Sequence, residues 1–305
     1  EVDKTDKVLD AACGSGGFLV KAMANMLKES GGINSDDAEI IKKERLYGIE
    51  FDSQLYALAC ANMLIHKDGK TNLEQLDTRT DEACEWIESK GITKVLMNPP
   101  FERKYGCIPI VKNVLDSVSA EFLYEFKLDK KTKKQRKVKK LRYTRKVKCA
   151  FILPDKKLEK DSSAKNLLKH HRLEKIIKLP ENLFLGEKTS IFIFTAGIPQ
   201  NNEEIFTCYI EDDGLESVKN QGRQDIRNKW SDLENKWVDI IHKQSGDDTI
   251  QWISPTEHLS YQITAKPFEL FEEDFNETVM DYLMFETGVN KKDLSEKIAN
   301  KILYQ

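Results

Sequence analysis

Short apolar runs alternate with stretches of helical spacing over the first two thirds of the chain, and this alternation limits the possible folds most. Residues 7–12 form an apolar run, a glycine-rich turn follows at residues 13–17, and residues 18–28 place their apolar side chains on one face of a helix. Repeated strand–helix units of this kind predict an α/β fold built around a mostly parallel sheet.

Seven buried strands are expected in this region. The fourth ends at Asn98-Pro99-Pro100, because proline has no amide hydrogen to donate to a sheet. The loop between the last two strands, residues 180–189, is too short for a parallel crossover, so these two strands should run antiparallel. The expected strands lie at residues 7–12, 45–50, 72–76, 93–97, 149–153, 174–179 and 190–195.

The pattern changes near residue 200, where we place a domain boundary. Residues 205–210 have the composition of an added strand, and residues 227–241 and 277–285 have helical spacing. We therefore expect a first domain at residues 1–200 and a smaller C-terminal region of helices and strands at residues 201–305.

The formal net charge of −3 conceals one strongly basic tract. Residues 127–148 contain thirteen Lys or Arg residues and a single acid, Asp129, so the rest of the chain is acidic. We interpret this tract as a solvated loop or a basic insertion. A mostly acidic chain does not coat nucleic acid unaided, so the tract or a partner must supply the attraction if the chain acts on DNA.

Cysteine usage and hydropathy exclude several protein classes. The six cysteines are scattered without a C-x-x-C pair, which argues against a disulfide framework or a metal site and favours a reducing, cytoplasmic location. The sequence has no run of about 18 apolar residues, so we expect no membrane span. The chain begins at Glu1 without an initiator Met or a leader, and we expect it to be a fragment without its natural N-terminus.

The glycine-rich turn is a candidate ligand site. It contains Gly14 and Gly16, between the strand that ends near Asp10 and the next helix. Glycines let the backbone approach a ligand closely, and a helix N-terminus presents free N–H groups. The spacing is not G-x-G-x-x-G, which argues against a nicotinamide or flavin. A tight turn that needs glycine for geometry alone is the simpler alternative.

Glu50 and Phe51 follow the second strand, in register with that turn. An acid at this strand tip can accept hydrogen bonds from both ribose hydroxyls, and Phe51 can pack on an adenine ring. The alternatives are a surface acid and a helix cap, and we expect Asp52 to be such a cap. No phosphate-binding cation follows, which indicates a nucleoside cofactor without a phosphate chain.

The sequence Asn98-Pro99-Pro100-Phe101 is the most specific signal. Ligands of open α/β sheets bind at the carboxyl ends of the strands, where this sequence lies. The prolines fix the backbone, so the Asn98 side chain and the Pro99 carbonyl are two acceptors suited to a planar NH2 group. Phe101 offers a flat surface on which the ring carrying that amine can stack. The alternative is a rigid proline turn with a capping asparagine.

These motifs resemble those of a known family. Residues 10–18 resemble the D-P-A-C-G-S-G-G-F motif of adenine-N6 DNA methyltransferases, and residues 98–101 resemble their N-P-P-F/Y motif, in the order of the gamma group. Residues 151–155, 177–184 and 188–194 are similar to segments of the methylation subunits of type I restriction-modification systems. This similarity covers residues 6–200 well and residues 201–265 more loosely.

The resemblance implies a fold, a cofactor and partners. The fold would be a Rossmann-like seven-stranded sheet, mostly parallel with one antiparallel strand, in the order 3-2-1-4-5-7-6. The reaction would transfer a methyl group from S-adenosylmethionine to N6 of a flipped-out adenine in DNA. The chain would act in a hetero-oligomer with a specificity subunit and a restriction subunit, which residues 201–305 would contact.

The resemblance also implies a role for each candidate residue. Glu50 would hold the ribose, Phe51 would pack on the cofactor's adenine, and Asp77 would accept from the adenine amino group. Asn98, Pro99, Pro100 and Phe101 would form the catalytic corner. Asp10, Gly14 and Gly16 would approach the methionine part of the cofactor, and Ala12 and Ser15 would also belong to the cofactor site.

Three departures from the family pattern are apparent. Ala11 stands where the family has proline, the family's N-terminal helical domain and its cofactor-contacting motif do not precede the first strand, and residues 126–147 form a basic insertion. We therefore expect this fragment to be inactive alone. The alternatives are an N-methyltransferase for a protein glutamine or an RNA base, and a scaffold subunit without cofactor. A dehydrogenase is disfavoured by the glycine spacing.

Overall fold

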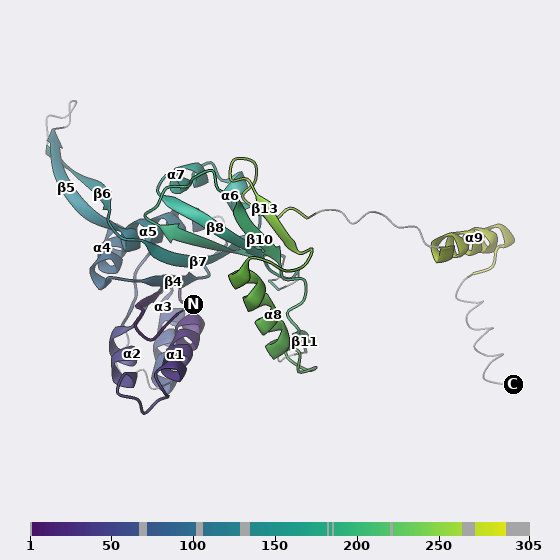
Figure 1. Ribbon diagram of the computed structural model, residues 1–305, viewed down its shortest axis with the longest axis horizontal. Helices are drawn as coiled ribbons and strands as arrows, with labels where there is room; N and C mark the ends of the chain where they lie inside the picture. The colour runs from purple at the N-terminus through teal and green to yellow at the C-terminus, as the bar shows by residue number, and fades with distance from the viewer. Residues whose placement is uncertain are drawn as a thin grey trace. The chain divides into compact units, whose positions relative to one another are not determined.

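A nine-stranded sheet forms the centre of residues 1–262, the larger of the two units into which the chain divides (Figure 1). The computed structural model describes residues 2–66, 72–101, 106–128, 135–181, 183–184, 186–219, 222–263 and 272–290. The strand order is β13-β10-β8-β9-β7-β4-β1-β2-β3. The strands are β1 (Val8–Asp10), β2 (Leu46–Ile49), β3 (Asn72–Glu74), β4 (Lys94–Met97), β7 (Val147–Pro154), β8 (His171–Lys178), β9 (Thr189–Ala196), β10 (Ile205–Tyr209) and β13 (Ile250–Ile253).

The predicted strands are present in the predicted order. β3, β2, β1, β4, β7, β9 and β8 are consecutive neighbours, which corresponds to the order 3-2-1-4-5-7-6. β9 pairs antiparallel with both β7 and β8, as expected from the short loop that precedes it. Two strands extend the sheet beyond β8. β10 was predicted and pairs parallel with β8, whereas β13 was not predicted and pairs antiparallel with β10.

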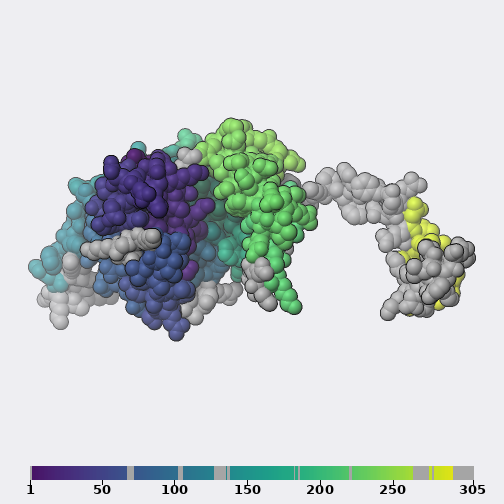
Figure 2. All heavy atoms as spheres, turned by 90° about the horizontal axis from the view of Figure 1, so that it is seen from below, coloured from purple at the N-terminus to yellow at the C-terminus, as the bar shows by residue number. Residues whose placement is uncertain are grey.

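Helices cover both faces of the sheet. On one face, α1, α2 and α3 lie over the half of the sheet formed by β1, β2 and β3, and α8 lies near β10 (Figure 1). Figure 2 shows this face, with the first helices in purple and blue and the α8 region in green. On this side α1 buries Leu19 and Met26 beside Val8. On the opposite face α5 buries Val111 and Leu115 in the largest apolar cluster. The helices are α1 (Gly17–Glu29), α2 (Ala38–Glu44), α3 (Ser53–Ile65), α4 (Asp81–Lys90), α5 (Cys107–Ser119), α6 (Lys157–Lys160), α7 (Ala164–Leu168) and α8 (Trp230–Lys243).

The basic tract contributes to a β-hairpin, so its interpretation as a solvated loop is wrong for the described residues. β5 (Ala120–Leu128) pairs antiparallel with β6 (Gln135–Tyr143) over the whole length of both strands. The aromatic residues Phe122, Tyr124 and Phe126 alternate with other residues along β5, which is the two-residue period of a strand. The density of charge obscured this period. A second small hairpin consists of β11 (Glu216–Val218) and β12 (Gly222–Gln224).

The predicted start of the C-terminal region at residue 201 differs from the division between the two units. β10, α8 and β13 continue the sheet and its apolar cover, so residues 201–262 belong to the larger unit. Residues 263–305 form the second unit, in which α9 (Glu272–Thr287) includes the helix predicted at residues 277–285. Among the described residues, no helix has both the length and the apolar character needed to cross a bilayer.

The turn after β9 requires Gly197. Its φ is +81°, and a Cβ at this position would lie 2.2 Å from the carbonyl oxygen of Arg145. Gly197→Ala should lower the free energy of unfolding by about 2 kcal/mol, because left-handed strain adds to a clash with backbone. Urea unfolding measures this loss. Gly31→Ala is the matched control, since Gly31 has φ +97° but open space around a Cβ. Equal losses in the two variants would contradict the clash.

Candidate active site

The glycine-rich turn connects the carboxyl end of β1 to α1. Gly14 and Gly16 have φ of +53° and +83°, a region that L side chains rarely adopt. The Gly16 N–H donates to the Cys13 carbonyl at 2.7 Å, and the Cys13 N–H donates to the Ile49 carbonyl of β2 at 3.0 Å. The turn is therefore fixed to the end of the neighbouring strand. Ser15 is exposed, and its carbonyl accepts from Asn62 of α3.

Glu50 joins the end of β2 to this turn. One carboxylate oxygen accepts from the Gly14 N–H at 2.9 Å, and the other accepts from the Asp52 N–H at 2.8 Å. The Asp52 carboxylate in turn accepts from the N–H groups of Gln54 and Leu55, so Asp52 is the predicted cap of α3. Each Glu50 oxygen keeps a lone pair with which it can accept a further hydrogen bond.

A pocket of about 350 Å³ opens at these strand ends. Seven of the predicted site residues line it, from the ends of β1, β2, β3 and β4: Ala12, Gly14, Glu50, Phe51, Asp77, Asn98 and Pro100. Phe51 is 57% exposed, which leaves its ring available to a ligand. Five predicted residues are next to the pocket in sequence but not part of its lining: Asp10, Ser15, Gly16, Pro99 and Phe101. The structure thus brings the three motifs together at one edge of the sheet.

Asn98 has an unusual environment. Its side-chain oxygen Oδ1 is buried and has no hydrogen-bond partner among the residues that the structure describes. A buried acceptor without a donor costs about 1–3 kcal/mol, so such atoms are rare and need an explanation. Because Asn98 lines the pocket, a donor on a bound molecule would satisfy this atom.

Phe101 lies beside a second aromatic residue that the sequence reasoning missed. Its ring packs edge-to-face on Phe184, with ring centroids 5.7 Å apart and an interplanar angle of 77°. Phe184 lies in the loop between β8 and β9. The carboxyl end of β8 lies on the same edge of the sheet as Asn98, and an aromatic residue in that loop was the available signal.

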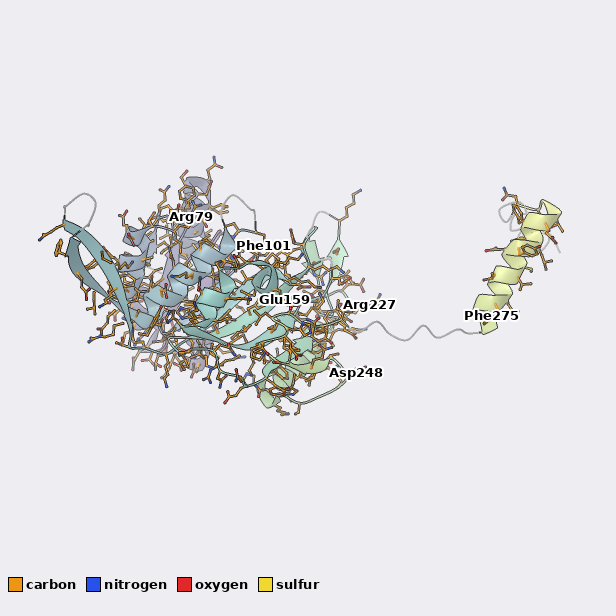
Figure 3. All side chains as sticks on the ribbon, turned by 90° about the horizontal axis from the view of Figure 1, so that it is seen from above. Arg79, Phe101, Glu159, Arg227, Asp248 and Phe275 are labelled. Atoms are coloured by element: carbon orange, nitrogen blue, oxygen red, sulfur yellow. The ribbon has the colours of Figure 1, made fainter. Side chains whose placement is uncertain are left out.

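Asp77 already has a partner in the pocket. Its carboxylate accepts from the Arg79 backbone N–H at 2.9 Å and forms an ion pair with the Arg79 guanidinium at 2.6 Å. These hydrogen bonds hold the pKa of Asp77 below its ordinary value. Arg79 lines the pocket and was not predicted (Figure 3). An adenine amino group would therefore share the Asp77 carboxylate with Arg79.

The Asp10 carboxyl is buried directly behind the turn. Burial is the main cause that raises the pKa of Asp10 to about 7; the hydrogen bond from the Ala12 N–H opposes the shift, and the nearby Glu50 charge adds to it. Burial also raises the pKa of the Cys13 thiol, which therefore stays protonated and is a filler of the turn rather than a nucleophile.

The raised pKa of Asp10 predicts a pH dependence. A cationic ligand favours the carboxylate, so affinity for S-adenosylmethionine should increase as pH rises through about 7. The expected change is about tenfold between pH 6 and pH 8. Calorimetric titration measures it, with Asp10→Asn as the variant that should bind weakly and without this dependence.

The same shift has a consequence for stability. Because the pKa of folded Asp10 lies above its unfolded value, the folded state loses stability as pH rises from about 4 to about 7. Asp10→Asn should therefore raise the unfolding temperature more at pH 8 than at pH 5. An Asp10→Asn variant whose unfolding temperature falls equally at both pH values would contradict the raised pKa of Asp10.

The pocket residues fit a nucleoside cofactor with a positively charged tail. Glu50 can accept from ribose hydroxyls and supplies negative charge at the glycine turn, Phe51 presents a ring face, and the Asp10 carboxyl lies buried behind the turn. Among the described lining residues, the cation is Arg79, which is paired with Asp77. A phosphate chain would meet carboxylates here, whereas a sulfonium and an ammonium group would be stabilised.

Comparisons with known proteins agree with this chemistry. The N-6 DNA methylase family matches residues 1–290. The chain is 31% identical over 303 residues to the type II restriction enzyme and methyltransferase RM.BcgI of Heyndrickxia coagulans, covering 93% of this chain and 43% of that protein. It is 25% identical over 210 residues to the methylase subunit of the type I restriction enzyme EcoEI of Escherichia coli, covering 64% of this chain and 39% of that subunit. The chain thus spans less than half the length of these relatives.

Solved structures share the fold. The methyltransferase subunit of a type I restriction-modification system from Streptococcus thermophilus aligns with a TM-score of 0.52 at 17% identity, covering 83% of this chain and 52% of that one. The EcoKI M protein of a type I restriction enzyme aligns with a TM-score of 0.53 at 14% identity, covering 76% and 49%. From the family match and the pocket together, the chain belongs to the N-6 DNA methylase family, whose cofactor is S-adenosylmethionine.

Proposed function

We propose that this chain is the catalytic part of a DNA methyltransferase that methylates N6 of a flipped-out adenine. The observation that carries the proposal is the buried Oδ1 of Asn98, an acceptor without a donor among the described residues, in the same pocket as Gly14 and Glu50. An exocyclic amine is a planar NH2 donor and would satisfy it. The N6 atom cannot be reached within a duplex, so the base has to leave the stack.

The residues of the pocket divide into two groups by the strands that carry them. Glu50 would hold the ribose and Phe51 would pack on the adenine of the cofactor, on the β1–β2 side. S-adenosylmethionine, when bound, supplies a methyl group already activated by a sulfonium. Because the leaving group is good, positioning accounts for most of the catalysis.

The β4 side would position the amine. Asn98 Oδ1 and the Pro99 carbonyl would accept from its two hydrogens, which draws the nitrogen lone pair out of conjugation and directs it into the pocket. Phe101 would stack on the base, and Phe184, in edge-to-face contact with Phe101, would hold that ring in place. The methylated nitrogen then loses a proton to water, so no cysteine nucleophile or strong base is needed.

Transfer of a labelled methyl group tests the proposal. The full-length protein with its native subunits should label duplex DNA, and nuclease digestion followed by mass spectrometry should find N6-methyladenine. A protein or an RNA substrate should remain unlabelled. Label in a glutamine side chain or an RNA base would instead support the alternative N-methyltransferases, and failure to bind S-adenosylmethionine would support a scaffold subunit.

Two protein contexts are compatible with this activity. In the first, the chain belongs to the modification subunit of a type I system and works with specificity and restriction subunits in a cytoplasmic hetero-oligomer; the fold shared with the EcoKI M protein supports it. In the second, methyltransferase and nuclease belong to one protein; the 31% identity to RM.BcgI, a restriction enzyme and methyltransferase, supports it. The mass of the purified full-length protein and its copurifying subunits distinguishes them.

A further inference from the structure

The β5–β6 hairpin begins and ends at one point of the molecule. α5 follows the Asn98 corner and runs away from the pocket, and the hairpin leaves at its last residue, Ser119. The Ser119 carbonyl accepts from the N–H groups of Thr144 and Arg145 at 2.9 and 3.0 Å, so the two strands meet there. The hairpin extends outward from α4 and α5 (Figure 1).

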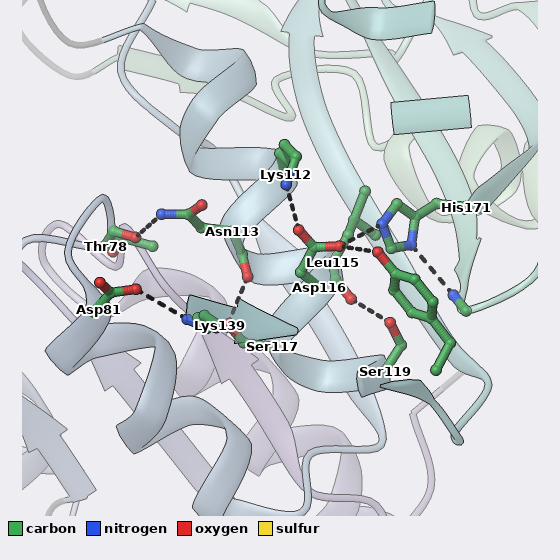
Figure 4. A network of polar contacts seen from close by, with 12 residues as sticks. Thr78, Asp81, Lys112, Asn113, Leu115, Asp116, Ser117, Ser119, Lys139 and His171 are labelled. Atoms are coloured by element: carbon green, nitrogen blue, oxygen red, sulfur yellow. Dashed lines mark hydrogen bonds and ion pairs between the residues drawn. The ribbon is translucent and has the colours of Figure 1, made fainter. Parts of the chain in front are cut away.

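A buried polar network holds the base of the hairpin to α5 and β8 (Figure 4). Asp116 Oδ1 accepts from the Tyr143 hydroxyl at 2.7 Å and lies 3.1 Å from His171 Nε2, while Lys112 binds the other oxygen. The Gly197 N–H donates to His171 Nδ1, so the proton of this histidine is on the nitrogen that faces Asp116. These hydrogen bonds hold the pKa of Asp116 at about 2, against the effect of burial.

The hairpin then runs back along α4 toward the pocket. Lys139 forms an ion pair with Asp81 at 3.0 Å, and Tyr124 donates to Glu85. Asp81 is the first residue of α4. It follows closely in sequence on Asp77 and Arg79, which line the pocket. The strand positions beyond Tyr124 and Lys139 therefore extend past the edge of the sheet at which the pocket opens.

Acidic and basic residues are distributed unevenly along the hairpin. The basic residues near its base have acidic partners, which are Glu121 for Arg142, Glu125 for Lys140 and Asp81 for Lys139. Farther out, the register places Lys127 opposite Arg136 and Phe126 opposite Lys137. The sequence from residue 127 to residue 137 contains seven Lys or Arg residues and one acid, so the positive charges there outnumber the acids that could neutralise them.

We propose that the outer ends of β5 and β6, residues 126–128 and 135–137, bind the phosphate backbone of DNA beside the target adenine. The inference rests on the proposed function. The rest of the chain is acidic and repels DNA, so the attraction has to come from this hairpin or from another subunit. These strand ends emerge on the side where the pocket opens, and their positive charge would hold a duplex there. Binding to phosphates carries no sequence information.

Removal of the charges tests the inference. The test protein carries three substitutions in the hairpin, Lys127→Gln, Arg136→Gln and Lys137→Gln. The control protein carries Lys28→Gln, Lys43→Gln and Lys90→Gln. The control loses the same charge from the last turns of α1, α2 and α4, at the opposite edge of the sheet. The full-length protein with its subunits is titrated with a fluorescent duplex at several salt concentrations. The hairpin variant should bind at least about tenfold more weakly, with a salt slope lower by about one for each phosphate that is no longer neutralised.

Further measurements distinguish weaker DNA binding from a loss of folded or active enzyme. S-adenosylmethionine affinity, the unfolding temperature and kcat at saturating DNA should not change, while the KM for DNA rises. Equal affinity and salt slope in the two triple variants would overturn the inference. So would loss of a copurifying subunit with unchanged DNA affinity, which would make the hairpin a protein-binding element. If the unmodified protein does not methylate DNA, the proposed function fails first.

Discussion

Asn98→Ala should lower kcat for methyl transfer to DNA by about 100- to 1000-fold, the usual loss when one group that stabilises the transition state is removed. The reason is that Oδ1 of Asn98 is buried and has no partner among the described residues, so its hydrogen bond is available to the substrate. The same fact makes a second prediction for this variant. Removing a buried acceptor without a donor relieves a desolvation cost, so the unfolding temperature should stay the same or rise.

A lower kcat together with an unchanged or higher unfolding temperature distinguishes a catalytic Asn98 from a structural one. A capping asparagine would lower stability when it is replaced, and would affect kcat only through folding. Affinity for S-adenosylmethionine, measured by calorimetry, should change little because the cofactor residues lie on other strands. Asn34→Ala, in the segment between α1 and α2, is the control for a neutral change. Normal turnover in Asn98→Ala would remove this residue from the mechanism.

Glu50→Ala should weaken S-adenosylmethionine binding by about 100-fold, because two hydrogen bonds to an ionised carboxylate are lost at about 1.5–3 kcal/mol each and water replaces part of them. Glu50→Gln should give an intermediate loss, since the amide keeps one acceptor. Calorimetric titration in the full-length protein measures both.

Glu50 also accepts from the Gly14 N–H, so weaker binding could arise from a distorted turn. A ligand without ribose hydroxyls distinguishes the two causes. The 2′,3′-dideoxy analogue of S-adenosylhomocysteine should bind the unmodified protein more weakly than S-adenosylhomocysteine does. Glu50→Ala should bind the two ligands equally. If the variant still distinguishes them, the hydroxyls are recognised by another residue.

The strand order of the central sheet could be predicted because the sequence patterns that determine it lie within short segments of the chain. Apolar runs at residues 149–153, 174–179 and 190–195 and one short loop determine where β7, β8 and β9 run. β13 was missed because its residues, Ile250–Ile253, form a short edge strand whose pairing with β10 depends on contacts between distant residues. The hairpin was missed because exposed strands rich in lysine have the composition of a loop.

The sequence predicts those residues of the site that closely follow a strand of the parallel sheet. Ala12, Glu50, Asp77 and Asn98 follow strands whose carboxyl ends meet, and all of them line one pocket. Arg79 and Phe184 were not predicted, because only the folded chain shows that one pairs with Asp77 and the other packs on Phe101. The burial of α3 also depends on the folded chain, since Leu55 and Leu58 are apolar but 43% and 52% exposed.

The junction at Ser119 and Thr144 makes the hairpin a graftable module. Its two ends are joined by a backbone hydrogen bond, and neither strand belongs to the central sheet. The strand positions beyond Tyr124 and Lys139, which contact α4, can therefore be lengthened, shortened or exchanged for another segment with little effect on the pocket. The length and charge of the proposed DNA-binding strands can be changed there, while the residues that line the pocket are left as they are.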